Sequence, residues 1–190
     1  ESQLAVAKLL SDVGISIDMD YDTASGAYSS KVPKAMETYF NYDESVCLLY
    51  RDRYYSAEWE QMMKDELNEG RVVYYAGGTY DNSRHAFLCD GYNSEGYFHF
   101  NWGWNGSYNG YFLTTAMDPL NQSVAGSDSG YDFTQSMIIG IQPEKEGYEA
   151  RTNGYVKLDS WEIITSECNL GDHARIDVWG MWNCYEDTLG

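Results

Sequence analysis

One histidine and a short aromatic motif supply the residues in this chain that could do chemistry. His85 opens the stretch HAFLCDGY, and the motif Asn-Trp-Gly-Trp begins at Asn101, sixteen positions later (101 − 85). An imidazole exchanges protons near neutral pH, and an amide oxygen hydrogen-bonded to one ring nitrogen fixes the tautomer and orientation of the ring. The pattern is compatible with a base at His85 oriented by Asn101, with the Trp102 indole shielding that hydrogen bond from water.

The same residues allow two other interpretations. A histidine on a strand can be a satisfied structural residue without a chemical role. Aromatic side chains in a glycine-rich loop can form a platform for carbohydrate or protein ligands, and the candidates here are Trp102, Trp104, Tyr108 and Tyr111. Periodicity alone leaves three functions open: catalysis, aromatic-rich binding, and a purely structural or interaction role.

Helical patterns come first in the chain, and alternating patterns follow. Apolar residues recur at helical spacing in residues 2–14, 29–40 and 56–70. The segments with alternating or strand-like patterns are residues 45–50, 71–78, 85–92, 96–102, 110–116 and 133–142. Helices followed by an antiparallel run of strands predict an α+β fold.

The turn Asn-Ser-Glu-Gly, residues 93–96, pairs the strand of His85 with the strand of Asn101. Counting outward from the centre of this turn puts the position opposite His85 near residue 104. Asn101 then lies diagonally close to His85, within reach of a staggered or bulged pairing.

The composition changes around residues 143–152, where charged residues gather and apolar residues become sparse. We place a domain boundary there, between residues 1–143 and residues 144–190. Residues 155–164 and 174–182 alternate like strands, and we expect residues 144–190 to be the opening part of a β-sandwich domain.

The charge balance argues against two classes of partner. The chain has 30 acidic and 12 basic residues and a formal net charge of −18, which repels nucleic-acid phosphates and anionic lipid surfaces. No apolar run approaches the roughly 20 residues that a membrane-spanning helix needs. We therefore expect neither nucleic-acid nor membrane binding.

No metal or cofactor is expected either. Asp18, Asp20 and Asp22 have the spacing of an EF-hand start, but Thr23 and Ser29 occupy the positions where that loop needs Gly and Glu. A zinc site made of His85, Cys89 and His99 would require side chains from different strand phases. The sequence also has no phosphate-binding loop and no dinucleotide fingerprint.

The stretches GRVVYYAGG and HAFLCDGYNSEGYFHFNWGWNGSYNGYFLTTAMDP resemble the core of the streptopain family of bacterial cysteine peptidases, relatives of papain by fold. AVAKLLSDVGISIDMDYDTASGAYSSKVPKAMETYFNY resembles the same family, so the similarity covers about residues 4–142. The resemblance implies a papain-like α+β fold in which an antiparallel sheet or barrel half packs with helices. It also implies a catalytic His85, an orienting Asn101 and a shielding Trp102.

The chain departs from the family pattern at two places near the histidine. Ser83 and Arg84 stand where the family has glycine just before the histidine, and Asn105 stands where it has a glycine after the second tryptophan. We expect Arg84 to narrow the cleft or recruit acidic substrates. Trp104 and Arg84 are our candidates for substrate binding.

None of the four cysteines fits the family's nucleophile, which stands at a helix N-terminus well before the histidine. Cys47 lies in a strand pattern, Cys89 is only four residues beyond His85, and Cys168 and Cys184 follow the boundary. We therefore expect the nucleophile on an N-terminal segment or chain outside these residues. Without that segment apolar surface would stay exposed, and the isolated chain would be unstable or associated.

The resemblance implies a cysteine endopeptidase with peptide or protein substrates, an apolar preference near the cleaved bond, synthesis as a zymogen, and secretion by a bacterium. The sequence leaves open whether Cys168 and Cys184 form a disulfide.

Overall fold

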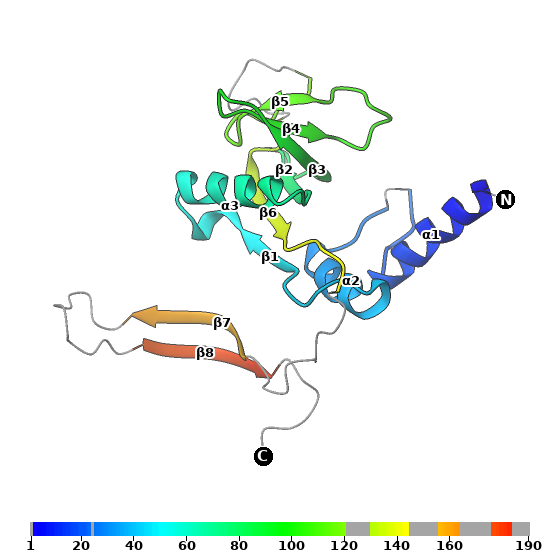
Figure 1. The fold of residues 1–190 in the computed structure, drawn as a ribbon. Coiled ribbons are helices and arrows are strands. Elements are labelled where there is room, and N and C mark those ends of the chain that lie inside the picture. Colours follow the sequence, from blue (N-terminus) through cyan, green and yellow to red (C-terminus); the bar gives the residue numbers. More distant parts are fainter. Residues whose placement is uncertain (1, 24, 121–129, 145–155, 164–175, 184–190) are drawn as a thin grey trace. The chain divides into compact units, whose positions relative to one another are not determined.

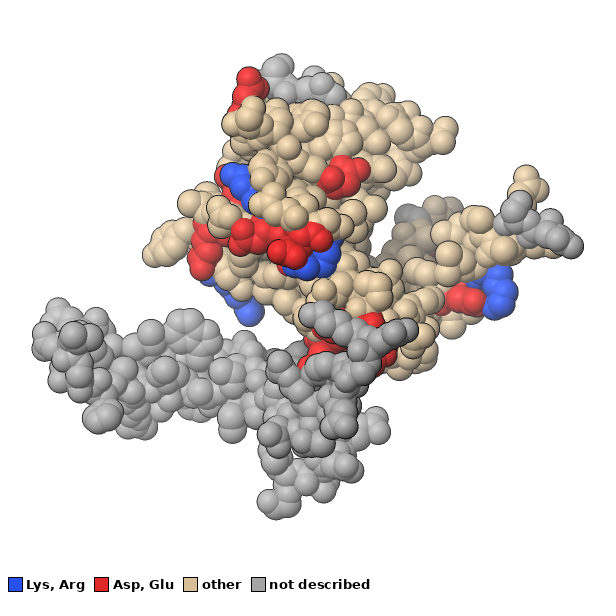
Figure 2. All heavy atoms as spheres, in the orientation of Figure 1, with Lys and Arg blue, Asp and Glu red and all other residues tan. Residues whose placement is uncertain are grey.

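A computed structural model describes residues 2–23, 25–120, 130–144, 156–163 and 176–183 (Figure 1). The chain divides into two compact units, Glu1–Lys145 and Glu146–Gly190, and each is described by itself. On the face drawn in Figure 2, acidic side chains cover more of the described surface than basic ones. Within the described residues, no helix combines the length and apolar character needed to cross a membrane.

The first unit begins with helices, as the sequence predicts. The helices are α1 (Ser2–Ser16), α2 (Val32–Phe40) and α3 (Ser56–Asn68), with short 3-10 turns at Ser29–Lys31 and Arg51–Arg53. A proline, Pro33, lies in the first turn of α2, where its missing N–H costs nothing. Asn41 ends α2 with a φ of 55°, the left-handed conformation that asparagine tolerates.

A six-stranded antiparallel sheet forms the rest of this unit. Its strands are β1 (Cys47–Tyr50), β2 (Val73–Gly78), β3 (Arg84–Tyr92), β4 (Phe98–Asn101), β5 (Gly110–Phe112) and β6 (Phe133–Ile139), in the order β1-β6-β2-β3-β4-β5. The predicted α+β fold with an antiparallel sheet is confirmed. Consecutive hairpins β2–β3 and β3–β4 put the strand of His85 near the middle of the sheet.

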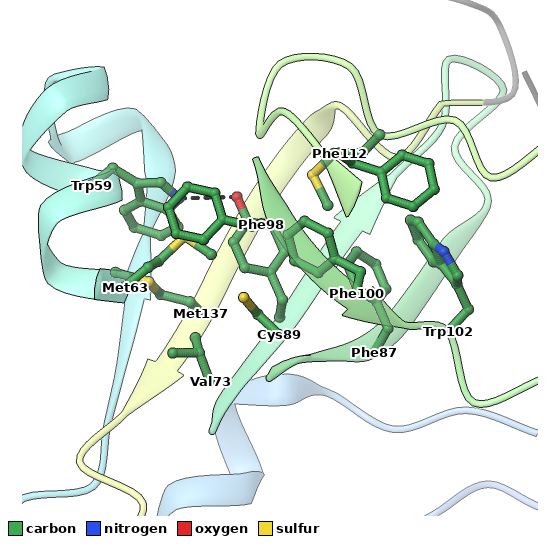
Figure 3. Close-up of a cluster of buried hydrophobic side chains, with 12 residues drawn as sticks. Trp59, Met63, Val73, Phe87, Cys89, Phe98, Phe100, Trp102, Phe112 and Met137 are labelled. Carbon is green, nitrogen blue, oxygen red and sulfur yellow. Dashed lines mark hydrogen bonds between the residues drawn. The ribbon is translucent and has the colours of Figure 1, made fainter. Parts of the chain in front are cut away.

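Helix α3 covers one face of the sheet, and the aromatic core lies between them (Figure 3). Trp59 and Met63 of α3 are fully buried against the inward side chains of the strands. The Trp59 indole N–H donates to the Tyr75 hydroxyl over 2.9 Å, which satisfies both buried polar groups. Tyr75 stacks on Phe87 of β3, so the core fixes the strand that carries His85.

The second unit contains β7 (Val156–Ile163) and β8 (Ile176–Asn183), which pair antiparallel. Both strands coincide with the segments that the sequence predicts as strands, and β8 extends one residue further, to Asn183. The assignment of residues 144–190 to a β-sandwich stays a prediction, and Cys168 and Cys184 lie outside the described residues.

Candidate active site around His85

His85 lies on the inner face of β3, together with Phe87 and Cys89. Side chains alternate along a strand, and the burial of β3 follows this alternation: Phe87 and Cys89 are buried, whereas Ala86 and Leu88 are exposed. The His85 side chain is half-buried at the edge of this aromatic core, opposite Gly77 of β2. The prediction that His85, Phe87 and Cys89 share one face of the strand is confirmed.

The main chain of Trp102 orients the imidazole. His85 Nε2 lies 2.7 Å from the Trp102 carbonyl oxygen. A carbonyl only accepts hydrogen bonds, so Nε2 carries the proton and donates it. In the neutral ring this leaves Nδ1 with its lone pair, which is the nitrogen able to take a proton from a nucleophile.

Asn101 is not the group that binds the imidazole, which corrects the expectation from the sequence. Its register partner is Leu88, whose side chain points to the outer face of the sheet, away from His85. The Asn101 Oδ1 instead accepts a hydrogen bond of 3.0 Å from the Gly103 N–H. Asn101 therefore contacts the turn that presents the Trp102 carbonyl and does not bind the imidazole itself.

A second asparagine fixes Trp102 from the other side. The Trp102 N–H donates to Asn109 Oδ1 over 3.1 Å. The Trp102 N–H, the Trp102 carbonyl and the Gly103 N–H thus each have a side-chain partner, and the acceptor for His85 is held in place. The sequence gives no signal of this role for Asn109, because its place in an Asn-Gly pair indicates a turn but does not define the contacts of its side chain.

The Trp102 indole is fully buried and packs on Phe87 with ring centroids 4.3 Å apart. Its Nε1–H has no hydrogen-bond partner among the described residues. The ring that covers the imidazole is Trp104, stacked on His85 at 4.7 Å with an interplanar angle of 23°. The ring stacked on the imidazole is therefore that of Trp104, and the shielding role expected for Trp102 stays a prediction.

The loop after Trp104 turns back through left-handed backbone. Asn105 has a φ of 54° and Gly106 a φ of 82°. Asparagine adopts this conformation more readily than other residues with a side chain. Asn105 can therefore adopt the left-handed backbone conformation of this turn, at a position where the family has glycine.

Arg84 lies apart from the imidazole. It is exposed, it is the first residue of β3, and strand alternation places it on the opposite face from His85. The structure thus brings together His85, Trp102 and Trp104 but leaves Arg84 outside this group.

Neither described cysteine fits the nucleophile that would pair with His85. Cys47 lies in β1, which is separated from β3 in the sheet by β6 and β2. Cys89 is fully buried, and burial raises the pKa of its thiol to about 12. A thiolate nucleophile needs a lowered pKa, so Cys89 is a core residue, as the sequence indicates.

This geometry argues against one alternative from the sequence, a single platform formed by four aromatic rings. The four proposed platform rings are not coplanar neighbours on one surface: Trp102 is buried, and Tyr111 lies on the outer face beside His99. No group of three or more potential metal ligands occurs among the described residues. His99 pairs with Asp90 on the outer face, away from His85 and Cys89.

Comparison with known proteins agrees with this fold. The model of the peptidase C10 family matches residues 1–112, more than half of the chain. The chain belongs to the peptidase C10 family. Its resemblance to streptopain is confirmed: streptopain of Streptococcus pyogenes is 37% identical over 142 residues, which cover 74% of this chain and 35% of that protein.

Two other relatives extend the comparison. A thiol protease/hemagglutinin PrtT of Porphyromonas gingivalis is 40% identical over 175 residues, 92% of this chain and 20% of that protein. The structure of active wild-type interpain A cysteine protease of Prevotella intermedia matches with a TM-score of 0.66 and 30% identity, over 72% of this chain and 56% of that one. The papain-like α+β fold class is thereby confirmed. This C10 chain spans between a fifth and about a third of the curated relatives' length.

Proposed function

We propose that this chain is the histidine-bearing part of a cysteine endopeptidase, with His85 as its general base. The observation that carries the proposal is the hydrogen bond from His85 Nε2–H to the Trp102 carbonyl. It selects the tautomer whose Nδ1 is free to accept a proton. The names of the relatives support the same chemistry, since they are thiol or cysteine proteases.

In the proposed reaction Nδ1 takes the proton of a cysteine thiol, and the resulting thiolate attacks the carbonyl carbon of a peptide bond. The imidazolium returns this proton to the leaving amine as the C–N bond breaks. Nδ1 then accepts a proton from water, the hydroxide oxygen displaces the thiolate, and the peptide acid leaves. Nε2 keeps its proton and its bond to Trp102 throughout.

The thiol is proposed to come from a cysteine-bearing segment outside these 190 residues. The apolar side chains of helix α1 support the existence of such a segment, because they are largely exposed: Leu4 is 77% exposed, Leu10 65% and Ile15 67%. Apolar surface of this extent favours contact with another segment. We propose that this segment covers α1.

Trp104 is proposed to contact the substrate next to the cleaved bond. It stacks on His85, is half-buried, and meets Tyr108 edge-on at 6.2 Å. These rings offer an apolar surface beside the reacting nitrogen, consistent with a preference for apolar side chains near the cleaved bond. We further propose secretion by a bacterium and synthesis as a zymogen, and one similar structure is of prointerpain A.

The test uses the complete polypeptide isolated from its source. A thiol-directed epoxide probe is reacted with it, and mass spectrometry locates the label. We expect a label on a peptide outside the 190 residues. We also expect His85→Ala to lower peptidase turnover by about 10²–10⁴-fold, the usual contribution of a general base.

His99→Ala is the matched control, because His99 lies on the outer face of the same sheet. It should leave labelling and turnover unchanged. Labelling of Cys47 or Cys89, absence of any label, or equal effects of the two histidine substitutions would contradict the proposal.

A further inference from the structure

An aromatic residue distant in sequence lies against His85. Tyr131, 46 positions later (131 − 85), has its ring centroid 5.6 Å from that of the imidazole, tilted by 45°. Its ring also lies within 6.4 Å of Phe87, Trp102 and Trp104. Tyr131 is therefore part of the wall around His85, and nothing in the histidine motifs marks it.

The backbone of Tyr131 fits closely onto β2 beside His85. Gly77 is the register partner of His85, and a Cβ added at Gly77 would lie 2.2 Å from the Tyr131 carbonyl oxygen. Only a glycine at position 77 allows this approach. The absence of a side chain at Gly77 thus leaves the space that the Tyr131 carbonyl occupies.

Hydrogen bonds clamp the Tyr131 segment to the chain after β5. The Tyr131 N–H donates to the Met117 carbonyl over 3.0 Å, and the Met117 N–H donates to Asp132 Oδ1 over 2.6 Å. The buried Gln135 side chain donates to the Thr114 carbonyl over 2.7 Å. These contacts hold the backbone on both sides of the tyrosine.

The backbone next to Tyr131 is also unusual. Thr134 has a φ of 46°, a conformation that a β-branched residue rarely adopts, at the point where the pairing of β6 with β2 shifts. Such strain persists only where the surroundings over-determine the conformation. These hydrogen bonds and the strained conformation of Thr134 together indicate that the surrounding structure fixes the position of Tyr131.

We infer that Tyr131 is a positioning residue for His85. Its ring blocks rotations of the imidazole that would break the hydrogen bond to the Trp102 carbonyl. Its importance for peptide hydrolysis rests on the proposed function, but its effect on the imidazole does not. Burial, followed by the negative charges of Asp81 and Asp118, raises the pKa of Tyr131, so the phenol stays neutral beside the histidine.

The test observes the imidazole directly by NMR in the complete polypeptide used for the labelling experiment, and it needs no peptidase activity. Tyr131→Leu removes the ring and should speed solvent exchange of the His85 Nε2–H by about fivefold to tenfold, the effect of one lost aromatic contact. Tyr131→Phe keeps the ring and should preserve the wild-type rate. This rescue by phenylalanine assigns the effect to the ring and not to the hydroxyl.

Tyr111→Leu is the matched control, because Tyr111 lies 5.1 Å from His99 and on the opposite face. It should move the His99 resonances and leave those of His85 in place. If Tyr131→Leu does not fold, Gly77→Ala displaces the Tyr131 backbone while keeping the ring, and the same faster exchange is expected.

An unchanged His85 exchange rate in a folded Tyr131→Leu or Gly77→Ala variant would overturn the inference. A uniform change at all histidines would overturn it as well, since it would reflect general loosening. If the epoxide experiment fails while these NMR results hold, the positioning role stands and the peptidase proposal falls.

Discussion

His85 and His99 lie on opposite faces of one sheet, and their surroundings differ in kind. His85 faces the aromatic core, donates to a neutral main-chain carbonyl and is stacked by Trp104. His99 faces outward, with its Nδ1 2.5 Å from Asp90 Oδ1. A carboxylate occupies one nitrogen of His99 in a partly exposed pair, whereas His85 keeps Nδ1 available. The core side of β3 thus holds an imidazole whose orientation is fixed by the Trp102 carbonyl and by the stacked Trp104 ring.

The largest expected effect is a difference in unfolding free energy between substitutions on the two faces of β3. Phe87→Ala removes a ring that contacts His85, Trp102 and Tyr131 and should cost about 3–5 kcal/mol of unfolding free energy. Leu88→Ala, one residue along and 39% exposed, should change it by less than about 1 kcal/mol. Urea unfolding of both variants measures the difference, and similar losses would show that the two faces do not differ as described.

The next expected effect compares two carboxylates. Glu66 is buried, and accepts hydrogen bonds from Arg71 and from the Gly140 N–H, whereas Asp90 is partly exposed beside His99. The hydrogen bond from Arg71 lowers the pKa of Glu66 below 4.5, against the opposing effect of burial. A lowered folded-state pKa stabilises the fold above the unfolded value, and this contribution is lost as pH falls through the folded value.

Glu66→Gln should therefore cost about 1–3 kcal/mol at pH 7 and reduce the dependence of stability on pH below 4.5. Asp90→Asn should cost about 0–1 kcal/mol at pH 7, as for an exposed pair. Urea unfolding between pH 7 and pH 3 checks both variants. An equal or larger loss for Asp90→Asn would remove this contrast.

Much of this arrangement follows from the sequence. Strand alternation predicts the inner face for His85, and counting from the turn at 93–96 pairs residue 88 with 101, as observed. The same count implies that Asn101 shares the outward face of Leu88. The Trp102 acceptor could not be predicted, because every residue has a carbonyl and only the loop geometry selects this one. The contact of Tyr131 with His85 could not be predicted either, because it depends on how β6 pairs with β2.

A moderate effect is expected at Asn101, which acts through the turn. Asn101→Ala removes the acceptor of the Gly103 N–H and should loosen the Trp102 carbonyl. The His85 Nε2–H should exchange about fivefold faster, the effect of a lost hydrogen bond of about 1 kcal/mol. NMR exchange checks this; an unchanged rate would mean that the turn holds the carbonyl without Asn101.

The smallest effect is expected at Arg84, on the face opposite His85. Arg84→Gly should change the unfolding free energy by about 0.5–1 kcal/mol at most, since glycine weakens a strand end slightly. The His85 resonances should stay in place. A large shift of the His85 signals would place Arg84 in the site and restore the narrowing of the cleft that the sequence suggests.

The most direct test of the account is the tautomer of His85. Nitrogen-15 NMR of the neutral imidazole distinguishes Nε2–H from Nδ1–H, and a coupling across the hydrogen bond identifies the acceptor. We predict a protonated Nε2 coupled to the Trp102 carbonyl, with Nδ1 unprotonated. A protonated Nδ1, or coupling of the ring to the Asn101 amide, would contradict the account.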